Sequence, residues 1–339
     1  MRRPLVVVDA DVLGRQRTGD ETYVANLLRE LGRQADDLRF VALTRRPELV
    51  PEGIEAYRVP AGAQHLRMAV SVPLALRRIR PDLVHFQYVL PPALHAPGVV
   101  TVHDLSFERD PTVMGQLDRL TFRTFVPRAV RRAARVLTVS ERSKRDLVEL
   151  YGADPGKVVV TPNGVDPVFR PGPDGGSGGY LLYVGAIQAR KDPLGALAAA
   201  DTAGLRLVVV GPVREPALAR ELERRGAELR GYVETGELAE VYRRAAALVL
   251  PSRYEGFGLP VLEAMASGTP VICSEDGALR EVAGDAAIYA TRDALGDAVK
   301  RALAERDRLA AAGVERARLY SWAETARRTI EVYREVLRA

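Results

Sequence analysis

The sequence predicts an α/β protein built from two parallel, doubly wound sheets. Short apolar segments alternate with segments of helical periodicity along the chain, as expected when helices cover both faces of each sheet. The length of 339 residues exceeds one ordinary hydrophobic core and indicates two domains. A Pro- and Gly-rich segment at residues 171–179 has the composition of a linker between them.

Six apolar runs predict strands in the first half, and helical patterns lie between them, for example over residues 21–31 and 116–134. Pro127 lies inside the second of these patterns and predicts an interruption of that helix, because proline has no backbone N–H to donate. The predicted strands cover residues 5–9, 39–43, 82–86, 99–102, 135–139 and 158–161.

The second half repeats this alternation. Its predicted strands cover residues 180–184, 206–210, 228–232, 247–250, 270–273 and 287–289. Two domains joined by a linker form a cleft, and open α/β sheets bind ligands outside the carboxyl ends of their strands. The functional residues are therefore expected at those ends.

The composition is that of a globular protein, with 47% hydrophobic and 27% charged residues. The single cysteine, Cys273, excludes a disulfide framework and suits a reducing cytosol. Met1 and two arginines run straight into the first strand, so no secretory leader is expected. No apolar run approaches the ~20 residues that a spanning helix needs. The net charge of +5 favours anionic partners, although no nucleic-acid partner is expected.

The most informative motif is Glu255-Gly-Phe-Gly-Leu-Pro-Val-Leu-Glu263, which follows a predicted strand and begins a helix. Glu255 is expected on the loop and Glu263 in the first helical turn. Gly256 and Gly258 let backbone N–H groups at a helix N-terminus approach an anion closely. Carboxylates beside an anion site suit a ligand that also carries hydroxyl groups. The motif therefore predicts a nucleotide-sugar site.

A second motif, Arg190-Lys191-Asp192-Pro193, follows the predicted strand 180–184 and begins another helix. Asp192 can cap this helix, and Pro193 can occupy its first position. Arg190 and Lys191 then lie beside a helix N-terminus, where a cation opposes the helix dipole unless an anion is bound. A solvated basic pair is the alternative, but the position favours a diphosphate site.

The first half carries weaker signals. His103 follows the predicted strand 99–102, and its spacing fits a structural role as well as a functional one. Gly14 and Gly19 stand at P-loop spacing, but the Lys-Ser/Thr pair is missing, so nucleotide hydrolysis of that type is not expected. Asp9 and Asp11 are interpreted as the end of the first strand.

The two glutamates with Gly-Phe-Gly-Leu-Pro between them resemble the E-x7-E signature of retaining glycosyltransferases of family 4. Tyr183-Val-Gly-Ala-Ile-Gln-Ala-Arg-Lys191 and Thr101-Val-His-Asp-Leu105 resemble other elements of that family. The resemblance covers essentially the whole chain and implies the GT-B fold, in which two Rossmann-like domains face each other across a cleft. It implies an acceptor-binding domain over residues 1–171, a donor-binding domain over 180–319, and a terminal helix over 320–339 that crosses back onto the first domain.

The resemblance also implies residue roles. Arg190 and Lys191 hold the donor diphosphate, and Glu263 holds the ribose hydroxyls. Glu255 binds the sugar, and His103 lines the sugar pocket, which makes Glu255, His103, Arg190 and Lys191 the candidate catalytic residues. The full set of candidate donor-binding residues is Gly19, Gly185, Arg190, Lys191, Tyr232, Val233, Glu255, Gly256, Phe257, Gly258, Leu259 and Glu263.

The implied reaction is transfer of a hexose from a nucleoside diphosphate sugar to a hydroxyl, with retention at the anomeric carbon. No metal or other cofactor is expected, because Arg190, Lys191 and the helices that begin at Pro193 and Pro260 supply positive charge. GDP-mannose and UDP-glucose are the leading donors. The acceptor is a glycan, a glycolipid or a small molecule. The expected location is the cytoplasm or the inner face of the membrane.

Several alternatives stay open. A glycoside hydrolase also uses paired carboxylates, but it does not need a cationic pair at a helix start. A non-catalytic nucleotide-sugar-binding protein and a sugar-nucleotide 2-epimerase share the fold. The basic segment 119–135, with Arg77, Arg78 and Arg80, is either a solvated surface or a weak contact with anionic membrane.

Overall fold

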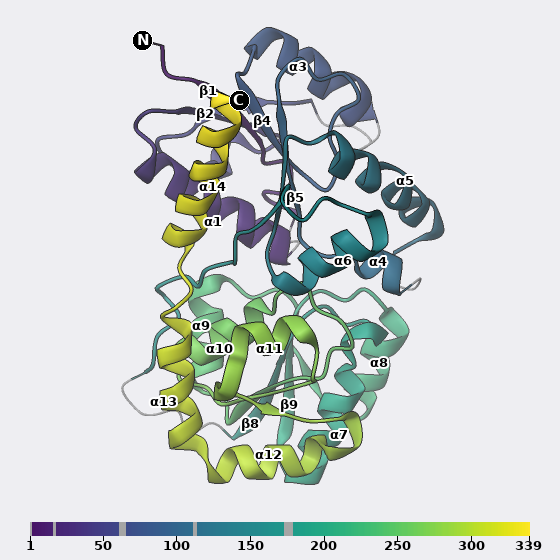
Figure 1. The fold of residues 1–339 in the computed structure, drawn as a ribbon. Coiled ribbons are helices and arrows are strands. Elements are labelled where there is room, and N and C mark those ends of the chain that lie inside the picture. Colours follow the sequence, from purple (N-terminus) through teal and green to yellow (C-terminus); the bar gives the residue numbers. More distant parts are fainter. Residues whose placement is uncertain (1, 16–17, 61–65, 111–113, 173–178) are drawn as a thin grey trace. The chain divides into compact units, whose positions relative to one another are not determined.

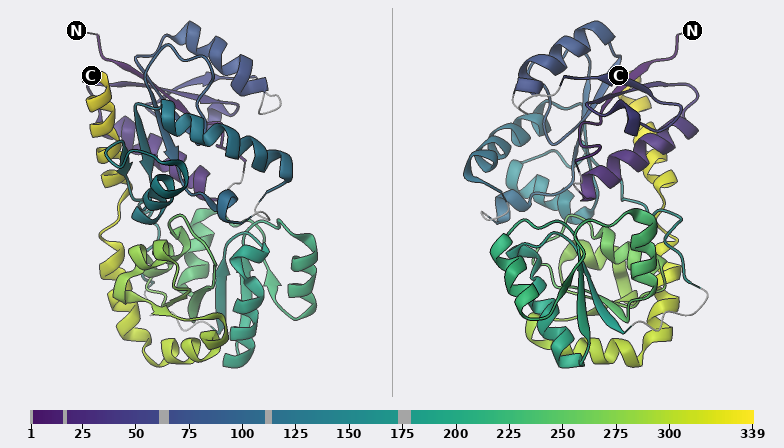
Figure 2. Two further views of the ribbon diagram at one scale, coloured as in Figure 1. Left: turned by 45° about the vertical axis from the view of Figure 1, so that its right-hand side comes forward. Right: turned by 180° about the vertical axis from the view of Figure 1, so that it is seen from behind.

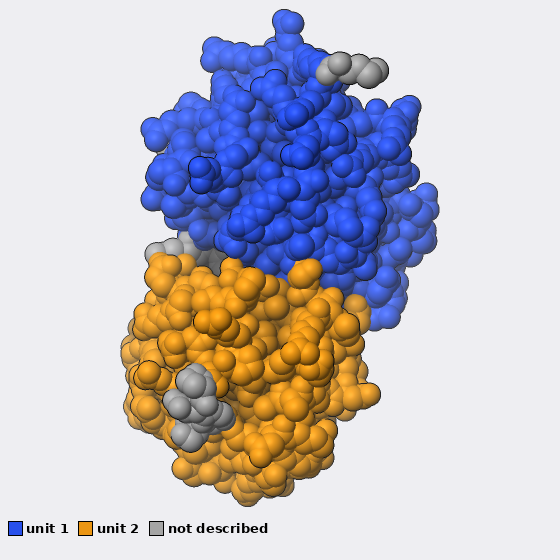
Figure 3. Space-filling model, turned by 90° about the vertical axis from the view of Figure 1, so that its left-hand side faces the viewer, with its two compact units in different colours: residues 1–164, 322–339 blue, residues 165–321 orange. Residues whose placement is uncertain are grey.

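The structure is a computed structural model that describes residues 2–15, 18–60, 66–110, 114–172 and 179–339 (Figure 1). The described chain divides into two compact units. Residues 1–164 and 322–339 form the first unit, and residues 165–321 form the second (Figure 3). Most of the segment expected to be a linker, residues 173–178, lies outside the described residues.

The first unit contains a seven-stranded sheet in the order β3-β2-β1-β4-β5-β6-β7. Every neighbouring pair is parallel, which confirms the predicted sheet type. The chain order reverses between β1 and β4, which makes this position the topological switch point. The strands are β1 Leu5–Asp9, β2 Arg39–Thr44, β3 Glu55–Arg58, β4 Leu83–Gln87, β5 Gly98–Val102, β6 Arg135–Thr138 and β7 Val158–Val160.

Strand β3 was not among the predicted strands. It lies at the edge of the sheet, and three of its four residues are exposed, so its sequence carries no apolar run. Its pairing with β2 through backbone hydrogen bonds makes it a strand. An edge strand of this kind has no neighbouring strand on one side and stays exposed, so a pattern of buried apolar residues does not identify it.

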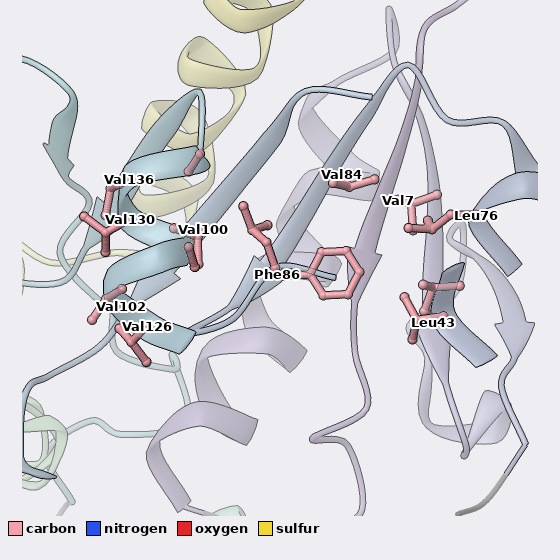
Figure 4. Close-up of a cluster of buried hydrophobic side chains, with 14 of the residues drawn as sticks. Val7, Leu43, Leu76, Val84, Phe86, Val100, Val102, Val126, Val130 and Val136 are labelled. Carbon is pink, nitrogen blue, oxygen red and sulfur yellow. The ribbon is translucent and has the colours of Figure 1, made fainter. Parts of the chain in front are cut away.

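Helices cover both faces of this sheet. Helices α3, α5 and α6 enclose one core, which Figure 4 shows from Val7 and Leu43 to Val126 and Val136. Helices α1 and α14 pack against each other on the other face. The helices of this unit are α1 Thr18–Gln34, α3 Val72–Ile79, α4 Ser106–Arg109, α5 Gln116–Arg132, α6 Glu141–Tyr151 and α14 Trp322–Arg338, with short turns η1 Pro47–Leu49 and η2 Arg67–Ser71.

Two helix predictions are corrected. Helix α1 begins at Thr18, earlier than the expected start at residue 21, so Gly19 lies in its first turn. Helix α5 continues through Pro127. The prediction of an interruption there was wrong, because Val126 and Ala129 on either side of the proline are both buried against the sheet and hold the helix in place.

The chain returns to the first unit through α14. Tyr333 of this helix is fully buried, and its hydroxyl lies 2.6 Å from His85 Nδ1 on β4. The other ring nitrogen, His85 Nε2, lies 2.7 Å from Thr101 Oγ1 on β5. Burial and nearby His103 lower the pKa of His85 to about 3, so the ring is neutral at physiological pH. This buried contact ties the last helix to the middle of the sheet.

The second unit contains a six-stranded parallel sheet in the order β10-β9-β8-β11-β12-β13. Figure 2 shows the strands and helices of this unit from two further sides. Its strands are β8 Tyr180–Val184, β9 Arg206–Val210, β10 Glu228–Leu229, β11 Ala247–Leu250, β12 Val271–Cys273 and β13 Ile288–Tyr289. Its helices are α7 Pro193–Ala203, α8 Pro216–Arg224, α9 Thr235–Arg243, α10 Leu259–Ala266, α11 Gly277–Ala283, α12 Leu295–Ala304 and α13 Arg306–Ala317. Across the described residues, no helix is both long and apolar enough to cross a membrane.

Candidate active site in the second unit

The loops that follow β8 and β11 lie side by side. These strands are neighbours in the sheet, and the chain order reverses between them. A parallel sheet binds ligands at such a switch point because the loops diverge outside the carboxyl ends of the strands. The first loop leads through the 3₁₀ turn η3, Ala189–Lys191, into α7, and the second leads into α10.

Lys191 and Glu255 form an ion pair between these two loops. Lys191 Nζ lies 2.6 Å from Glu255 Oε1 and 2.7 Å from Oε2, so both carboxylate oxygens accept from one ammonium group. Only 16% and 9% of the two side chains are exposed. Burial by itself raises the pKa of Glu255, but Lys191 and Arg190 outweigh it and hold this pKa below its ordinary value. Glu255 is therefore an anion in the free protein.

Arg190 lies beside this pair and is almost fully buried. Its Nη1 donates to the carbonyl oxygen of Tyr254. Its Nε is buried and has no hydrogen-bond partner within the part of the chain that the structure describes. A buried guanidinium with a spare donor suits an additional anionic or carbonyl acceptor.

Two hydrogen bonds from Arg253 to backbone carbonyl oxygens join the loops further. Arg253 N donates to Arg190 O at 3.0 Å, and Arg253 Nη2 donates to Ala189 O at 2.9 Å. Sequence reasoning did not identify Arg253, and no local pattern marks it, because its role depends on the loop from β8 lying next to it. The structure thus brings Arg190, Lys191 and Glu255 together. Lys191 and Glu255 are 64 positions apart in the sequence, as are Arg190 and its partner Tyr254.

Glu263 lies deeper than the sequence suggested. It is the fifth residue of α10, so it lies in the second turn and not in the first. Its side chain is buried, and Glu263 Oε2 accepts a hydrogen bond of 2.9 Å from Tyr242 OH. Burial is the main reason that the pKa of Glu263 rises to about 7, with a smaller contribution from Asp166. The carboxyl group therefore changes its charge near neutral pH.

The glycine-rich turn before α10 places backbone N–H groups at a helix N-terminus. Gly258 is the N-cap residue, with a φ of 109°, and no side chain caps this helix. A Cβ at Gly258 would come within 2.6 Å of Leu279 Cδ2, so both the conformation and the space require glycine. Phe257 is buried, with its ring edge-on to Tyr320 at a centroid distance of 5.9 Å. Gly256 and Leu259 complete the turn, which is a suitable anion site.

The helix α7 differs in this respect. Asp192 caps this helix, and its side chain accepts a hydrogen bond from Gly195 N. A carboxylate is therefore already bound at the positive, N-terminal end of the α7 dipole. The predicted cap is confirmed, and Pro193 is the first helical residue as expected. Of the two helix N-termini that the sequence singled out, only that of α10 lacks a side-chain cap.

The remaining candidates of the second unit follow β8 and β10. Gly185 N donates to Val210 O at 2.8 Å, which holds the end of β8 against β9. Strand β10 ends at Leu229, earlier than predicted, so Tyr232 and Val233 lie on the loop beyond it. Tyr232 exposes 44% of its surface.

His103 and Gly19 belong to the first unit. His103 follows β5 and is buried, with Nε2 at 2.8 Å from Gln87 Oε1 at the end of β4. Its ring packs edge-on to Tyr23 with centroids 4.7 Å apart. Gly19 is an exposed residue in the first turn of α1 and does not lie on the loop before that helix, because the helix begins at Thr18.

Asp9 and Asp11 are held by arginines at the end of β1. Arg45 donates to Asp11 Oδ1 at 2.6 Å through Nε and to Oδ2 at 2.8 Å through Nη2. The fully buried Arg67 donates to Asp9. The interpretation of this Asp-x-Asp as a strand end agrees with these contacts. Within the described ranges, no group of three or more His, Cys, Asp or Glu residues is arranged to hold a metal ion.

Comparison with known proteins matches both halves of the chain to glycosyltransferase family models. Residues 17–169 match the model of Glycosyltransferase Family 4, and residues 173–319 match that of Glycosyl transferases group 1. The O-antigen chain mannosyltransferase B of Escherichia coli is 29% identical over 327 residues, covering 87% of this chain and 83% of that protein. The D-inositol 3-phosphate glycosyltransferase of a Nocardioides species is 34% identical over 308 residues, covering 75% of this chain and 67% of that protein.

The solved structure of sucrose-phosphate synthase from Thermosynechococcus elongatus superposes with a TM-score of 0.82 at 21% identity, covering 98% of this chain and 99% of that one. The two Rossmann-like parallel sheets and this structural similarity define the GT-B fold. The chain belongs to the family 4 glycosyltransferases, whose second half is the group 1 domain.

Proposed function

We propose that the protein is a retaining hexosyltransferase that moves a hexose from a nucleoside diphosphate sugar to an acceptor hydroxyl. The observation that carries this proposal is the Lys191–Glu255 pair beside the uncapped N-terminus of α10. Cations, backbone N–H groups and an ionised carboxylate meet within one pair of loops. A sugar diphosphate is the ligand that needs all three, because it carries both anionic phosphates and hydroxyl donors.

Each residue has a distinct role in this proposal. Arg190 and Lys191 neutralise the diphosphate, assisted by the N–H groups at Phe257 and Gly258. Glu255 accepts from hydroxyls of the hexose, and Glu263 accepts from the ribose hydroxyls. No side chain acts as a nucleophile. The leaving phosphate oxygen takes the proton of the attacking acceptor hydroxyl, so catalysis consists of positioning and of stabilising the departing diphosphate.

The identity of the donor is proposed from the relatives. One is named as a mannosyltransferase, which favours GDP-mannose, with UDP-glucose as the second candidate. The acceptor proposed is a hydroxyl of a glycan, a glycolipid or a small molecule. His103 of the first unit is proposed to contact the hexose.

A thermal-shift panel of UDP-, GDP-, ADP- and TDP-sugars tests the donor proposal. A true donor at a hundred times its dissociation constant adds about 2.7 kcal/mol of apparent stability. We expect this gain for one nucleobase and its nucleoside diphosphate, and a much smaller one for the nucleoside or the free hexose. A panel with no stabilising nucleotide would contradict the proposal.

Release of nucleoside diphosphate then separates the alternatives. Release that depends on an acceptor supports transfer. Donor binding without release would indicate a non-catalytic nucleotide-sugar-binding protein, and conversion of the sugar without an acceptor would indicate a 2-epimerase. Hydrolysis of a plain glycoside would favour a glycoside hydrolase.

A surface on the first unit favours a second proposal, a weak contact with anionic lipid. Helices α3 and α5 pack on the same face of the sheet and expose apolar side chains outward. On α5 these include Leu117 and Leu120, which are 71% and 64% exposed. The exposed apolar residues of these helices and of the segment just before α3 are Leu66, Val70, Leu74, Leu117, Leu120 and Phe125, and the exposed arginines of α3, its C-cap and α5 are Arg77, Arg78, Arg80, Arg123, Arg128, Arg131 and Arg132.

Flotation with phosphatidylserine vesicles at low salt tests this contact. We expect partial co-migration, because each well-placed cation contributes up to about 1 kcal/mol near an anionic surface. Replacing Arg77 and Arg78 by Gln is expected to abolish it, since both lie about one helical turn from the exposed Leu74 on α3. The matched control replaces Arg224 and Arg225, which lie on the second unit. Equal flotation of both variants, or none of the wild type, would contradict the proposal.

A further inference from the structure

Asp192 joins the turn that carries Arg190 and Lys191 to helix α7. Turn η3 contains only three residues, and Asp192 is both its C-cap and the N-cap of α7. The backbone of Asp192 is left-handed, with a φ of 47° and a ψ of 52°. Within the described ranges, only two other non-glycine residues, Arg80 and Tyr88, have a positive φ. This conformation is costly for most L-residues, and aspartate tolerates it because its short side chain can bond locally.

Two contacts of the Asp192 carboxylate compensate for this cost. Oδ1 accepts from Gly195 N at 3.2 Å, and Oδ2 lies 2.9 Å from Arg292 Nε. Gly195 is fitted closely to this arrangement, since a Cβ there would come within 2.5 Å of Asp192 Oδ2. The carboxylate is thus fixed between a backbone N–H, a guanidinium and a glycine that leaves room for it.

The two cations directly precede this left-handed residue. Lys191 Nζ donates to both oxygens of Glu255, and Arg190 donates to Tyr254 O. We propose that Asp192 is a positioning residue, whose left-handed turn and helix cap hold Arg190 and Lys191 against the loop that carries Glu255. For the identity of the ligand, a nucleoside diphosphate, this inference rests on the proposed function. For the geometry it rests on the contacts alone.

Four substitutions separate the contributions of the left-handed turn, the helix cap and the ion pair with Arg292. Asp192→Asn keeps both the tolerated turn and a capping oxygen and loses only the ion pair with Arg292. Asp192→Gly keeps the turn but loses the cap. Asp192→Ala loses both. Gly195→Ala leaves every charge in place and pushes the carboxylate out of its position, while alanine by itself favours the helix.

The measured quantities are the dissociation constants of UDP and GDP and of their parent nucleosides, because their ratio isolates the contribution of the diphosphate. We expect Asp192→Ala to raise the constant for the diphosphate by about tenfold and to leave that for the nucleoside within about twofold, as loss of one charge-assisted contact predicts. Asp192→Asn is expected to resemble the wild type, and Asp192→Gly to lie between them. Gly195→Ala is expected to match Asp192→Ala without loss of thermal stability.

A second measurement needs no ligand. The pKa of Glu255, followed by NMR of its carboxyl carbon, is expected to rise in Asp192→Ala and in Gly195→Ala, because Lys191 is then no longer held against it. Equal losses of affinity for the nucleoside and the nucleoside diphosphate would overturn the inference. So would wild-type behaviour of Asp192→Ala and Gly195→Ala in both measurements. If the wild type bound no nucleoside diphosphate, the proposed function would fail, and the titration of Glu255 would still decide the role of Asp192.

Discussion

Replacing Glu255 by Gln is expected to lower kcat by about 10- to 100-fold while the affinity for nucleoside diphosphate stays the same or increases. The carboxylate is proposed to lie against the hexose, where its charge contributes most as the sugar gains positive character, and a charge-assisted contact contributes about 1.5–3 kcal/mol. Affinity for the diphosphate is retained because the substitution releases Lys191 from an ion pair of 2.6 and 2.7 Å. Steady-state kinetics and calorimetric titration with nucleoside diphosphate measure the two effects.

Glu263→Gln is the matched control, because it changes the other carboxylate of the motif in the same way. It is expected to weaken the donor and the free nucleoside diphosphate alike, with little change in kcat, which is the result of losing uniform binding. Wild-type kinetics in both variants would show that the site is wrongly assigned.

The pH dependence separates the two glutamates further. Burial raises the pKa of Glu263 to about 7, so this group is mostly protonated at pH 6 and mostly ionised at pH 8. Only the ionised carboxylate accepts fully from two ribose hydroxyls. Nucleotide affinity is therefore expected to rise as the pH rises through about 7, and Glu263→Gln is expected to flatten this rise. The pKa of Glu255 is lowered, so Glu255 stays ionised over the same range.

Lys191→Ala is expected to weaken donor binding by about 10- to 150-fold, whereas excess EDTA is expected to change the rate by less than about twofold. Lys191 and Arg190 are proposed to supply the charge that a bound metal supplies in other glycosyltransferases. The variant also leaves Glu255 as a buried anion beside the proposed diphosphate site, which adds repulsion to the loss of attraction. Initial rates with EDTA, and donor titrations of Lys191→Ala and Arg190→Ala, measure these effects.

Two control variants test whether the loss of affinity in Lys191→Ala is due to the charge at that position. Lys191→Arg keeps the charge and is expected to retain more affinity than Lys191→Ala. Lys300→Ala removes an exposed lysine of the same unit and is expected to leave affinity unchanged. Loss of activity in EDTA that manganese restores would contradict metal independence and would direct attention to Asp9 and Asp11, although both are held by arginines in this structure.

Much of the fold follows from the sequence because burial and periodicity act locally. Strands such as Leu5–Asp9 and Tyr180–Val184 are buried throughout, so their apolar runs identify them directly. The exposed edge strand Glu55–Arg58 has no such pattern and was missed. At Pro127 a local rule predicted a break in the helix, and this prediction was wrong. Packing of the neighbouring residues against the sheet keeps α5 continuous.

The sequence by itself determined the fold class, the positions of the two motif loops, and the residue types on which the proposed donor site rests. Only the tertiary structure decided how those residues meet. It paired Lys191 with Glu255, buried Glu263 beside Tyr242, and set Arg253 and Arg292 against the turn that carries the cations. Charge pairing and pKa values depend on distance and burial across separate strands. A linear pattern records neither quantity, because residues that are far apart in the chain become neighbours only when the parallel sheet brings its carboxyl ends together.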